Sequence, residues 1–290
     1  MPEFLLEFPE LLRLDLAGWI DSIVSWLLTN WPAFFNAIGS ILLMALLSIE
    51  RFLLWLPWTV IVIALGLIAW RVMRLWWAGL LMAVFLVLIG SFGYWEQSMI
   101  TLSVIITAVI LSLAIGLPTG IIMARSNTIE AVLRPILDTM QTIPSFVYLI
   151  PALILFGLGV VPAVFATVIY AIPPVIRLTN VGIRQVPQSV TEAAQAFGSS
   201  GRQVLFEVQL PLALPAIMVG INQTTMMALA MAVIASMIGA RGLGQELVQA
   251  IIHVEAGRGF QAGVSIILLA IIIDRLTHAL VSRQEYKITS

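Results

Sequence analysis

Long apolar runs, separated by short polar segments, make up most of the chain. A helix needs about 20 apolar residues to cross the ~30 Å of hydrocarbon in a bilayer. About seven runs approach or reach that length, and we expect each to be a membrane-spanning helix. They cover residues 58–70, 75–92, 99–123, 139–157, 160–176, 212–238 and 262–280. The first run is short unless it begins earlier, near Phe52.

The residues before these runs follow a different pattern. From 17 to 29, apolar and polar positions separate onto two helix faces, and residues 33–54 predict a longer apolar helix with a polar stripe. Trp19, Trp26 and Trp31 would anchor the pair at headgroup level, so we expect both helices to lie along the membrane interface. The alternative is that 33–54 crosses the membrane, which would add one span and invert the N-terminus.

A polar island, residues 189–211, separates the fifth run from the sixth. Ser189 and Glu192 have the spacing of a capping box, which predicts a helix that begins at Val190. Gly198 stands where a left-handed residue would end that helix after about two turns.

The second half of the island predicts another short helix. Ser200 and Gln203 repeat the capping-box spacing, so this helix should begin near Gly201 and end at Pro211. Helices this short are not stable alone in water. We therefore expect the island to be held by a partner.

The composition narrows the class of protein. The chain is 61% hydrophobic and only 10% charged, whereas a soluble domain carries about 25% charged residues. This predicts an all-α polytopic membrane protein. Cysteine is absent and histidine occurs only twice, so we expect no metal site and no cofactor in the chain, and a net charge of −1 gives no reason to expect nucleic acid binding. The N-terminus lacks the basic region of a secretory signal.

The placement of Lys and Arg predicts how the spans are oriented. With seven spans, one side would carry ten basic residues: Arg71, Arg74, Arg125, Arg134, Arg177, Arg184, Arg202, Arg275, Arg283 and Lys287. The other side would carry four: Arg13, Arg51, Arg241 and Arg258. The rule puts the polar island and the C-terminus in the cytoplasm and the N-terminus outside.

Prolines and glycines inside the spans favour a transporter over a simple anchor. Pro118, Pro144, Pro151, Pro173 and Pro174 lie within or beside spans, and broken helices are common in transporters.

Gly116 and Gly120 form a step that allows close helix approach. We expect it to serve packing within one subunit rather than a dimer contact.

The residues of the polar island carry a family resemblance. The stretch EAAQAFG, followed after nine residues by V-x-L-P, resembles the cytoplasmic coupling loop of ABC importer permeases, with Val in place of the usual Ile. The residues carried over as contacts to the ATPase are Glu192, Ala193, Ala194, Phe197, Gly198, Val208, Leu210 and Pro211. The two alanines would let the helix sit deep in a groove, and the glycine would permit a tight elbow.

The resemblance extends over residues 97–282. The stretches INQTTMMALAMAVIASMIGARGLGQEL and DRLT, with the segment before the island, resemble the glycine betaine/proline betaine permeases. This implies a type I ABC importer transmembrane domain. Its N-terminal scaffold would cover 1–56, two accessory helices 57–96, the permease core 97–282 with coupling loop 189–211, and a cytoplasmic tail 283–290.

The resemblance also implies partners. Two ATPase subunits would bind ATP and Mg²⁺, since the chain has no phosphate-binding loop of its own. A second permease copy would complete the pathway, and an extracytoplasmic binding protein would deliver the substrate, in the cytoplasmic membrane of a bacterium or archaeon. Glycine betaine is the implied substrate, and choline, carnitine, trimethylamine N-oxide and proline betaine stay open.

Several residues are candidates for the translocation path. Polar residues in the middle of the sixth run either line the path or hydrogen-bond between helices, and Tyr148 either offers an aromatic face to a quaternary ammonium or packs in the core. The candidates are Tyr148, Asn222, Gln223, Thr225 and Met226.

The glycines of the IGARGLG turn are candidates for the outer gate and for contact with the binding protein. They are Gly239, Gly242 and Gly244.

Two other classes of protein fit less well. An ion-coupled secondary transporter would usually show inverted repeats and an acidic residue near the membrane midplane, and neither is visible. An intramembrane serine enzyme could use G-S-S-G at 198–201, but no histidine lies near in the sequence.

Overall fold

The computed structural model describes residues 15–289, with side chains to residue 280, and this part of the chain is helical without strands. The elements before the island are α1 (Leu16–Asn30), α2 (Pro32–Trp55), α3 (Trp58–Met73), α4 (Trp76–Ser91), α5 (Trp95–Arg125), α6 (Asn127–Thr142), η3 (Ser145–Tyr148), α7 (Leu149–Phe156) and α8 (Val160–Arg184). Those that follow are α9 (Gln188–Ala196), α10 (Gly201–Gln203), η4 (Val204–Gln209), α11 (Leu210–Ile234), η5 (Ala235–Ile238), α12 (Leu243–Ile252) and α13 (Ala256–Thr289).

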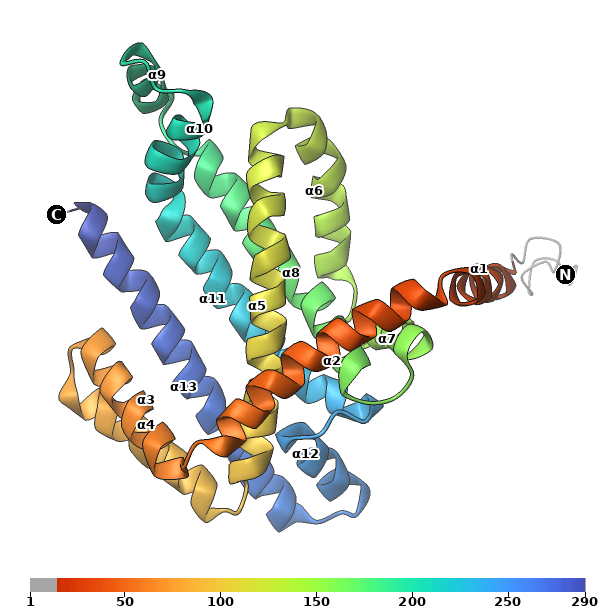
Figure 1. The fold of residues 1–290 in the computed structure, drawn as a ribbon. Helices are drawn as coiled ribbons and strands as arrows, with labels where there is room; N and C mark the ends of the chain where they lie inside the picture. The colour runs from red at the N-terminus through yellow and green to blue at the C-terminus, as the bar shows by residue number, and fades with distance from the viewer. Residues whose placement is uncertain (1–14, 290) are drawn as a thin grey trace, which may run out of the picture.

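The centre of the molecule is formed by α5, α8 and α11, which lie side by side (Figure 1). Small residues allow this close approach. A Cβ on Gly116 would lie 2.4 Å from a methyl of Val175 in α8, and one on Gly120 would lie 2.7 Å from the carbonyl of Ile176. The glycine step therefore packs within one subunit, as its sequence suggested.

The long spans match the sequence prediction in part. Within the described part of the chain, five helices are long and apolar enough to cross a membrane: α2, α5, α8, the continuous helix Gly201–Ile238, and Ala256–Leu280 within α13. A sixth span results if the bent pair of α6 with η3–α7 crosses as one. The apolar helices α3 and α4 have 16 residues each, about 24 Å of helix, which is shorter than the hydrocarbon layer.

The span predicted over 139–157 is broken in the structure. The chain is helical to Thr142, breaks at Ile143–Pro144, and resumes at an angle of 111°. A residue that precedes proline is sterically biased away from the helical region, and Ile143 is extended, with ψ at 128°. The first arm, α6, runs back along α5, and the second arm, α7, packs against α8.

The hairpin of α3 and α4 forms a side layer against α13 (Figure 1). Gly66 and Gly79 bring its two helices together, since a Cβ on Gly79 would lie 2.4 Å from the Gly66 carbonyl. Ile272 of α13 is buried in the same cluster as Val62 and Met82.

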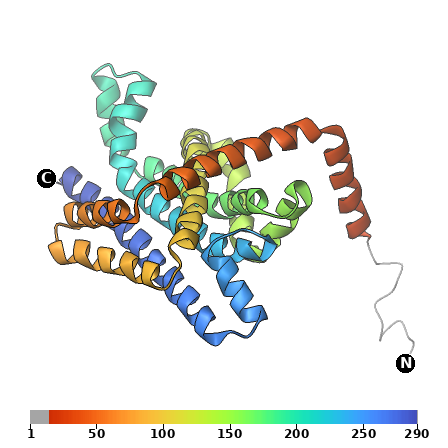
Figure 2. The same cartoon turned by 60° about the horizontal axis from the view of Figure 1, so that its bottom comes forward.

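The N-terminal helices extend away from the bundle (Figure 2). α2 packs against α5 through Leu42 and Leu46, but half of its large apolar residues are exposed, and α1 has no buried residue. The interfacial placement of this pair stays a prediction, as does the division of the chain at residues 56, 96 and 282. Arg13 lies outside the described residues, as do the side chains of Arg283 and Lys287.

Candidate functional site: the coupling segment

The predicted coupling loop stands at one end of the molecule, clear of the helical bundle (Figure 1). We call residues 188–209, which comprise α9, α10 and η4, the coupling segment. α8 leads into it and α11 continues out of it. A displacement of this segment would therefore act directly on α8 and α11, two of the three central helices.

α9 begins two residues earlier than its capping pattern predicted. The helix starts at Gln188 with Pro187 as its N-cap, and Ser189 caps nothing. Proline favours a helix start because its φ is fixed and it lacks the N–H that would go unpaired there. Glu192 instead accepts a hydrogen bond from the side chain of Gln188 at 2.7 Å.

The turn between α9 and α10 agrees with the prediction. Gly198 has a φ of +90°, and the N–H of Ser199 donates to the carbonyl of Ala194 at 3.1 Å, which closes the helix as a Schellman motif. Ser200 and Gln203 form the predicted capping box. A left-handed glycine and a cap together fix the elbow.

The prediction that Pro211 ends the second helix is wrong. Helical backbone continues from Gly201 to Ile238, and Pro211 lies in the first turn of α11. Just before it, η4 is a π-helix in which the N–H of Leu210 donates to the carbonyl of Leu205. The wider turn relieves the clash that a proline makes with the carbonyl four residues earlier.

Exposure distinguishes the coupling segment from the bundle. No residue of α9 is buried, and the ring of Phe197 is 92% exposed. Val208 and Leu210 are partly buried, while Val204 and Leu205 are buried and secure the segment to the bundle. Exposed aromatic residues on a short, rigid element are typical of a protein–protein contact.

A polar network supports the base of the coupling segment. Arg184, the last residue of α8, forms an ion pair with Glu130 of α6 at 3.1 Å. Its guanidinium also donates to Asn127 at 2.8 Å and to the carbonyl of Met123 at 3.1 Å. Arg177 and Asp138 form a second ion pair between α8 and α6. The network ties the end of α8 to α5 and α6.

The translocation-path candidates of α11 differ in their surroundings. Asn222 accepts a hydrogen bond from Thr277 of α13 at 2.5 Å, and Thr225 donates to the carbonyl of Ile221 in its own helix. Gln223 is exposed, and Met226 is partly buried. A role of any of them in the path stays a prediction.

Tyr148 is buried where the bent pair meets α8. Its hydroxyl donates to the carbonyl of Met140, and its ring lies edge-on to Tyr170 with centroids 5.7 Å apart. These contacts brace the bend after Pro144. They also place two aromatic rings together beside the central helices.

The IGARGLG turn lies at the opposite end of the molecule from the coupling segment (Figure 1). Gly239 and Gly242 have positive φ values of 91° and 125°, and a Cβ on Gly244 would lie 2.7 Å from the Val233 carbonyl. The N–H of Leu243 donates to Thr101 of α5 at 2.8 Å. The glycines thus let the chain reverse closely against α5, and their gating role stays a prediction.

Two polar groups lay beyond the sequence predictions. Arg184 was counted only as a charge, and its partner Glu130 lies 54 positions earlier. Arg258 forms ion pairs with Glu246 at 2.7 Å and with Glu255 at 3.2 Å, which joins α12 to the start of α13. Only the i,i+3 spacing of Glu255 and Arg258 is a local signal.

Comparison with known proteins identifies the class. Residues 116–286 match the family described as binding-protein-dependent transport system inner membrane component. The chain belongs to this family, and it is the inner-membrane permease subunit of a binding-protein-dependent ABC importer.

Two curated relatives are similar over almost the whole chain. The glycine betaine/proline betaine transport system permease protein ProW of Escherichia coli (strain K12) is 46% identical, with 92% of this chain and 75% of the relative covered. The glycine betaine/carnitine transport permease protein GbuB of Listeria monocytogenes (serotype 1/2a, strain 10403S) is 45% identical, with 93% of this chain and 97% of the relative covered.

A solved structure shares the fold. An inward-facing structure of the MetNI methionine ABC transporter superposes with a TM-score of 0.58 and 22% identity, covering 63% of this chain and 92% of that one. This supports the type I importer fold expected from the sequence. The chain is thus a multi-pass inner-membrane protein and a transport subunit, and its family works with an ATPase and a substrate-binding protein.

Proposed function

We propose that this chain forms the membrane pathway of an importer for glycine betaine. The observation that carries the proposal is that ProW and GbuB, each similar over more than nine-tenths of the chain, are both named for glycine betaine. Their second named substrates differ, being proline betaine and carnitine. The shared substrate is therefore the best supported one.

The coupling segment would receive the ATPase. Ala193 and Ala194 expose only small side chains, so α9 fits a groove closely, and Phe197 offers an exposed anchor. Two permease copies would pair to form the pathway, and each would contact one ATPase subunit that binds ATP and Mg²⁺. Closure of the ATPases would push on α9, and α8 and α11 would carry that movement into the membrane.

The orientation follows from the basic residues. Arg125 and Arg184 lie at the end of the bundle that carries the coupling segment, since a Cβ on Gly201 would lie 3.8 Å from the Arg125 guanidinium. Arg241 and Arg258 belong to the other end, in the IGARGLG turn and at the start of α13. By the positive-inside rule, we expect the coupling segment to face the cytoplasm. With the seven spans expected from the sequence, the N-terminus would then face outside.

The permease would alternate between a conformation open to the outside and one open to the cytoplasm, and it would release the substrate without binding it tightly. A quaternary ammonium is attracted to aromatic faces, and Tyr148 and Tyr170 offer such faces beside the bend. A substrate shifts the conformational equilibrium only by its difference in affinity for the two states. We therefore expect selection to lie mainly in the binding protein and only weakly in Tyr148, Gln223 and their neighbours.

Proteoliposomes test the proposal. The permease, its ATPase and its binding protein are reconstituted together, and uptake of labelled glycine betaine is followed with and without ATP. The expected result is ATP-dependent uptake that needs the binding protein. ATP-dependent uptake of choline, carnitine or trimethylamine N-oxide, without uptake of glycine betaine, would contradict the assignment of glycine betaine as the substrate.

A further inference from the structure

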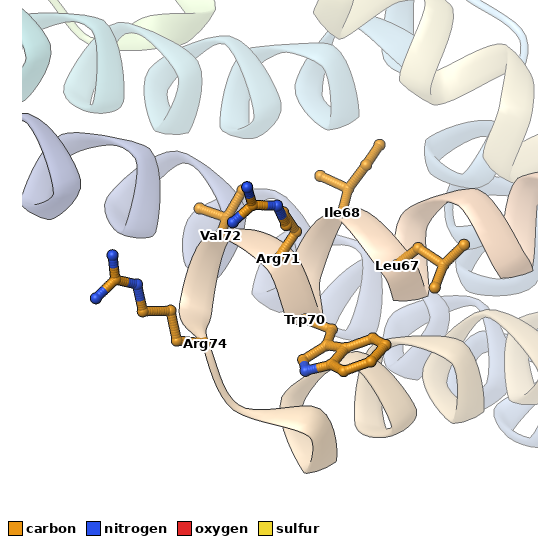
Figure 3. A pocket seen from close by; sticks show the side chains of 6 residues that line it. All are labelled: Leu67, Ile68, Trp70, Arg71, Val72 and Arg74. Atoms are coloured by element: carbon orange, nitrogen blue, oxygen red, sulfur yellow. The ribbon is translucent and has the colours of Figure 1, made fainter.

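A cavity at the tip of the α3–α4 hairpin has no part in the transport proposal. Its volume is about 690 Å³, and it is lined by Leu67, Ile68, Trp70, Arg71, Val72 and Arg74. Figure 3 shows the two arginines at the end of α3 near the turn, with Leu67 and Ile68 further along the helix. The lining is therefore apolar along the helix and cationic at its end.

Among the described side chains, residues 15–280, no carboxylate forms an ion pair with either arginine, Arg71 or Arg74. The sequence has no acidic residue between Arg51 and Glu96. Two unpaired cations that line one cavity favour an anion bound between them.

More positive charge converges on the same place from α13. A smaller adjoining cavity shares Val72 with the first and is lined by Arg275 and His278. Arg275 is 62% exposed, and its guanidinium lies 4.0 Å from the carboxylate of Asp274, which is a weak contact in solvent. The hairpin tip and α13 thus form one basic surface.

The apolar part of the surface indicates what kind of anion binds. Leu67, Ile68 and Trp70 are each about half exposed, and Trp76 is 69% exposed at the start of α4. Tryptophan side chains favour the headgroup level of a membrane, where an apolar ring meets polar groups. A free phosphate ion would gain nothing from these walls, whereas a lipid fits both parts.

We propose that the tip of the α3–α4 hairpin binds an anionic phospholipid, with Arg71 and Arg74 contacting its phosphate headgroup. Leu67, Ile68 and Trp70 contact the upper part of its acyl chains, and Arg275 adds to the attraction. Basic pockets between membrane helices are known to hold such headgroups. The proposal rests on the proposed placement of the protein in the membrane, and it is independent of the transported substrate.

Lipid binding to the purified full-length permease tests the proposal without any transport assay. Native mass spectrometry counts the bound molecules while phosphatidylglycerol or phosphatidylcholine is titrated into the detergent solution. The expected result is preferential binding of phosphatidylglycerol. An arginine near an anionic lipid contributes about a fivefold change in affinity, so the double variant Arg71→Gln/Arg74→Gln should bind about 25-fold more weakly.

Two further variants serve as controls. One tests whether the charge of the arginines is what matters, and the other tests whether any equal loss of net charge has the same effect. Arg71→Lys/Arg74→Lys keeps both charges and should retain most of the binding. Arg51→Gln/Arg134→Gln removes the same net charge elsewhere and should bind phosphatidylglycerol like the wild type.

Three outcomes of the lipid titrations would overturn the proposal. They are equal binding of the two lipids, unchanged phosphatidylglycerol binding by Arg71→Gln/Arg74→Gln, and an equal loss in Arg51→Gln/Arg134→Gln. Millimolar inorganic phosphate serves as a competitor. If it displaces the lipid, the cavity is a site for free phosphate instead.

Discussion

Sixteen buried residues lie along α8, whereas α9, which begins only four positions after α8 ends, has none. The first helix is held by its neighbours on nearly every side, and glycines and alanines set its distance to α5 and α11. The second is held at its ends, by Pro187 and by the turn at Gly198. The bundle therefore finds its stability within this chain, whereas the coupling segment makes few contacts within it, and we propose that an ATPase partner covers it.

The comparison predicts that changes in the coupling segment abolish function without harm to the bundle. Gly198→Val forces a β-branched residue into a left-handed conformation, which costs about 1–2 kcal/mol locally. Ala193→Trp places a large ring on the face of α9. We expect either variant to abolish ATP-dependent uptake in proteoliposomes.

The same variants should insert into the membrane and elute from a sizing column like the wild type. Gly257→Val is the matched control, because that glycine has open space around it and lies at the opposite end of the molecule. Normal uptake by Ala193→Trp or Gly198→Val would remove the coupling assignment.

In the bundle, we expect substitutions to lower the stability of the protein. Gly120→Ala would bring a Cβ to 2.6 Å from the Thr179 Cβ and 2.7 Å from the Ile176 carbonyl. Overpacking of this kind costs about 1–3 kcal/mol, so thermal unfolding in detergent should occur at a lower temperature. The same change at Gly263, which has no neighbour within 4 Å, should leave the melting temperature unchanged or raise it. Equal effects at both positions would contradict the packing described here.

Arg184 lies where the two regions meet. Arg184→Gln removes its ion pair with Glu130 and leaves that carboxylate, 18% exposed, with a weaker partner. Allowing for solvent screening, we expect a loss of about 1–2 kcal/mol in unfolding free energy.

Arg134→Gln is the control, since Arg134 is 67% exposed and 4.0 Å from the same carboxylate. Denaturant titration followed by circular dichroism measures both variants. A larger loss in Arg134→Gln than in Arg184→Gln would show that Arg134, and not Arg184, is the main partner of Glu130.

The smallest expected effect distinguishes residues of α11 that pack against other helices from residues that line the translocation path. Asn222→Ala removes the hydrogen bond from Thr277, and such bonds between membrane helices are worth about 0.6 kcal/mol on average and about 1.7 at most. Gln223→Ala removes an exposed amide and should not change the melting temperature. If Gln223 lines the path, its variant alters the concentration dependence of uptake instead. If Gln223→Ala lowers the melting temperature and Asn222→Ala alters only uptake, then Gln223 serves packing and Asn222 lines the path.

The sequence predicts most of the fold because run length is a strong signal in membranes. The helices α5, α8, α11 and α13 follow directly from it. The bend after α6 does not, because Pro144 removes a donor but cannot dictate a direction. Contacts such as the hydroxyl of Tyr148 on the Met140 carbonyl accompany the 111° angle, and these depend on the tertiary structure.

The coupling segment shows where local rules succeed and where they fail. Gly198 and the Ser200 capping box form as predicted because nothing nearby competes with them. The box at Ser189 fails because Pro187 already begins the helix, and Pro211 does not end a helix because η4 widens the turn before it. The pairing of Arg184 with Glu130 has no local signal, since it depends on how α6 lies against α8.

The most direct test of the central claim is retention of the ATPase by tagged permease. Phe197→Ser removes the most exposed aromatic anchor of the coupling segment, and loss of such an anchor should weaken the complex about tenfold or more. Phe260→Ser removes another exposed ring, 74% exposed, at the opposite end of the molecule, and should retain the ATPase fully. Equal retention by Phe197→Ser and wild type would contradict the claim that this segment holds the ATPase.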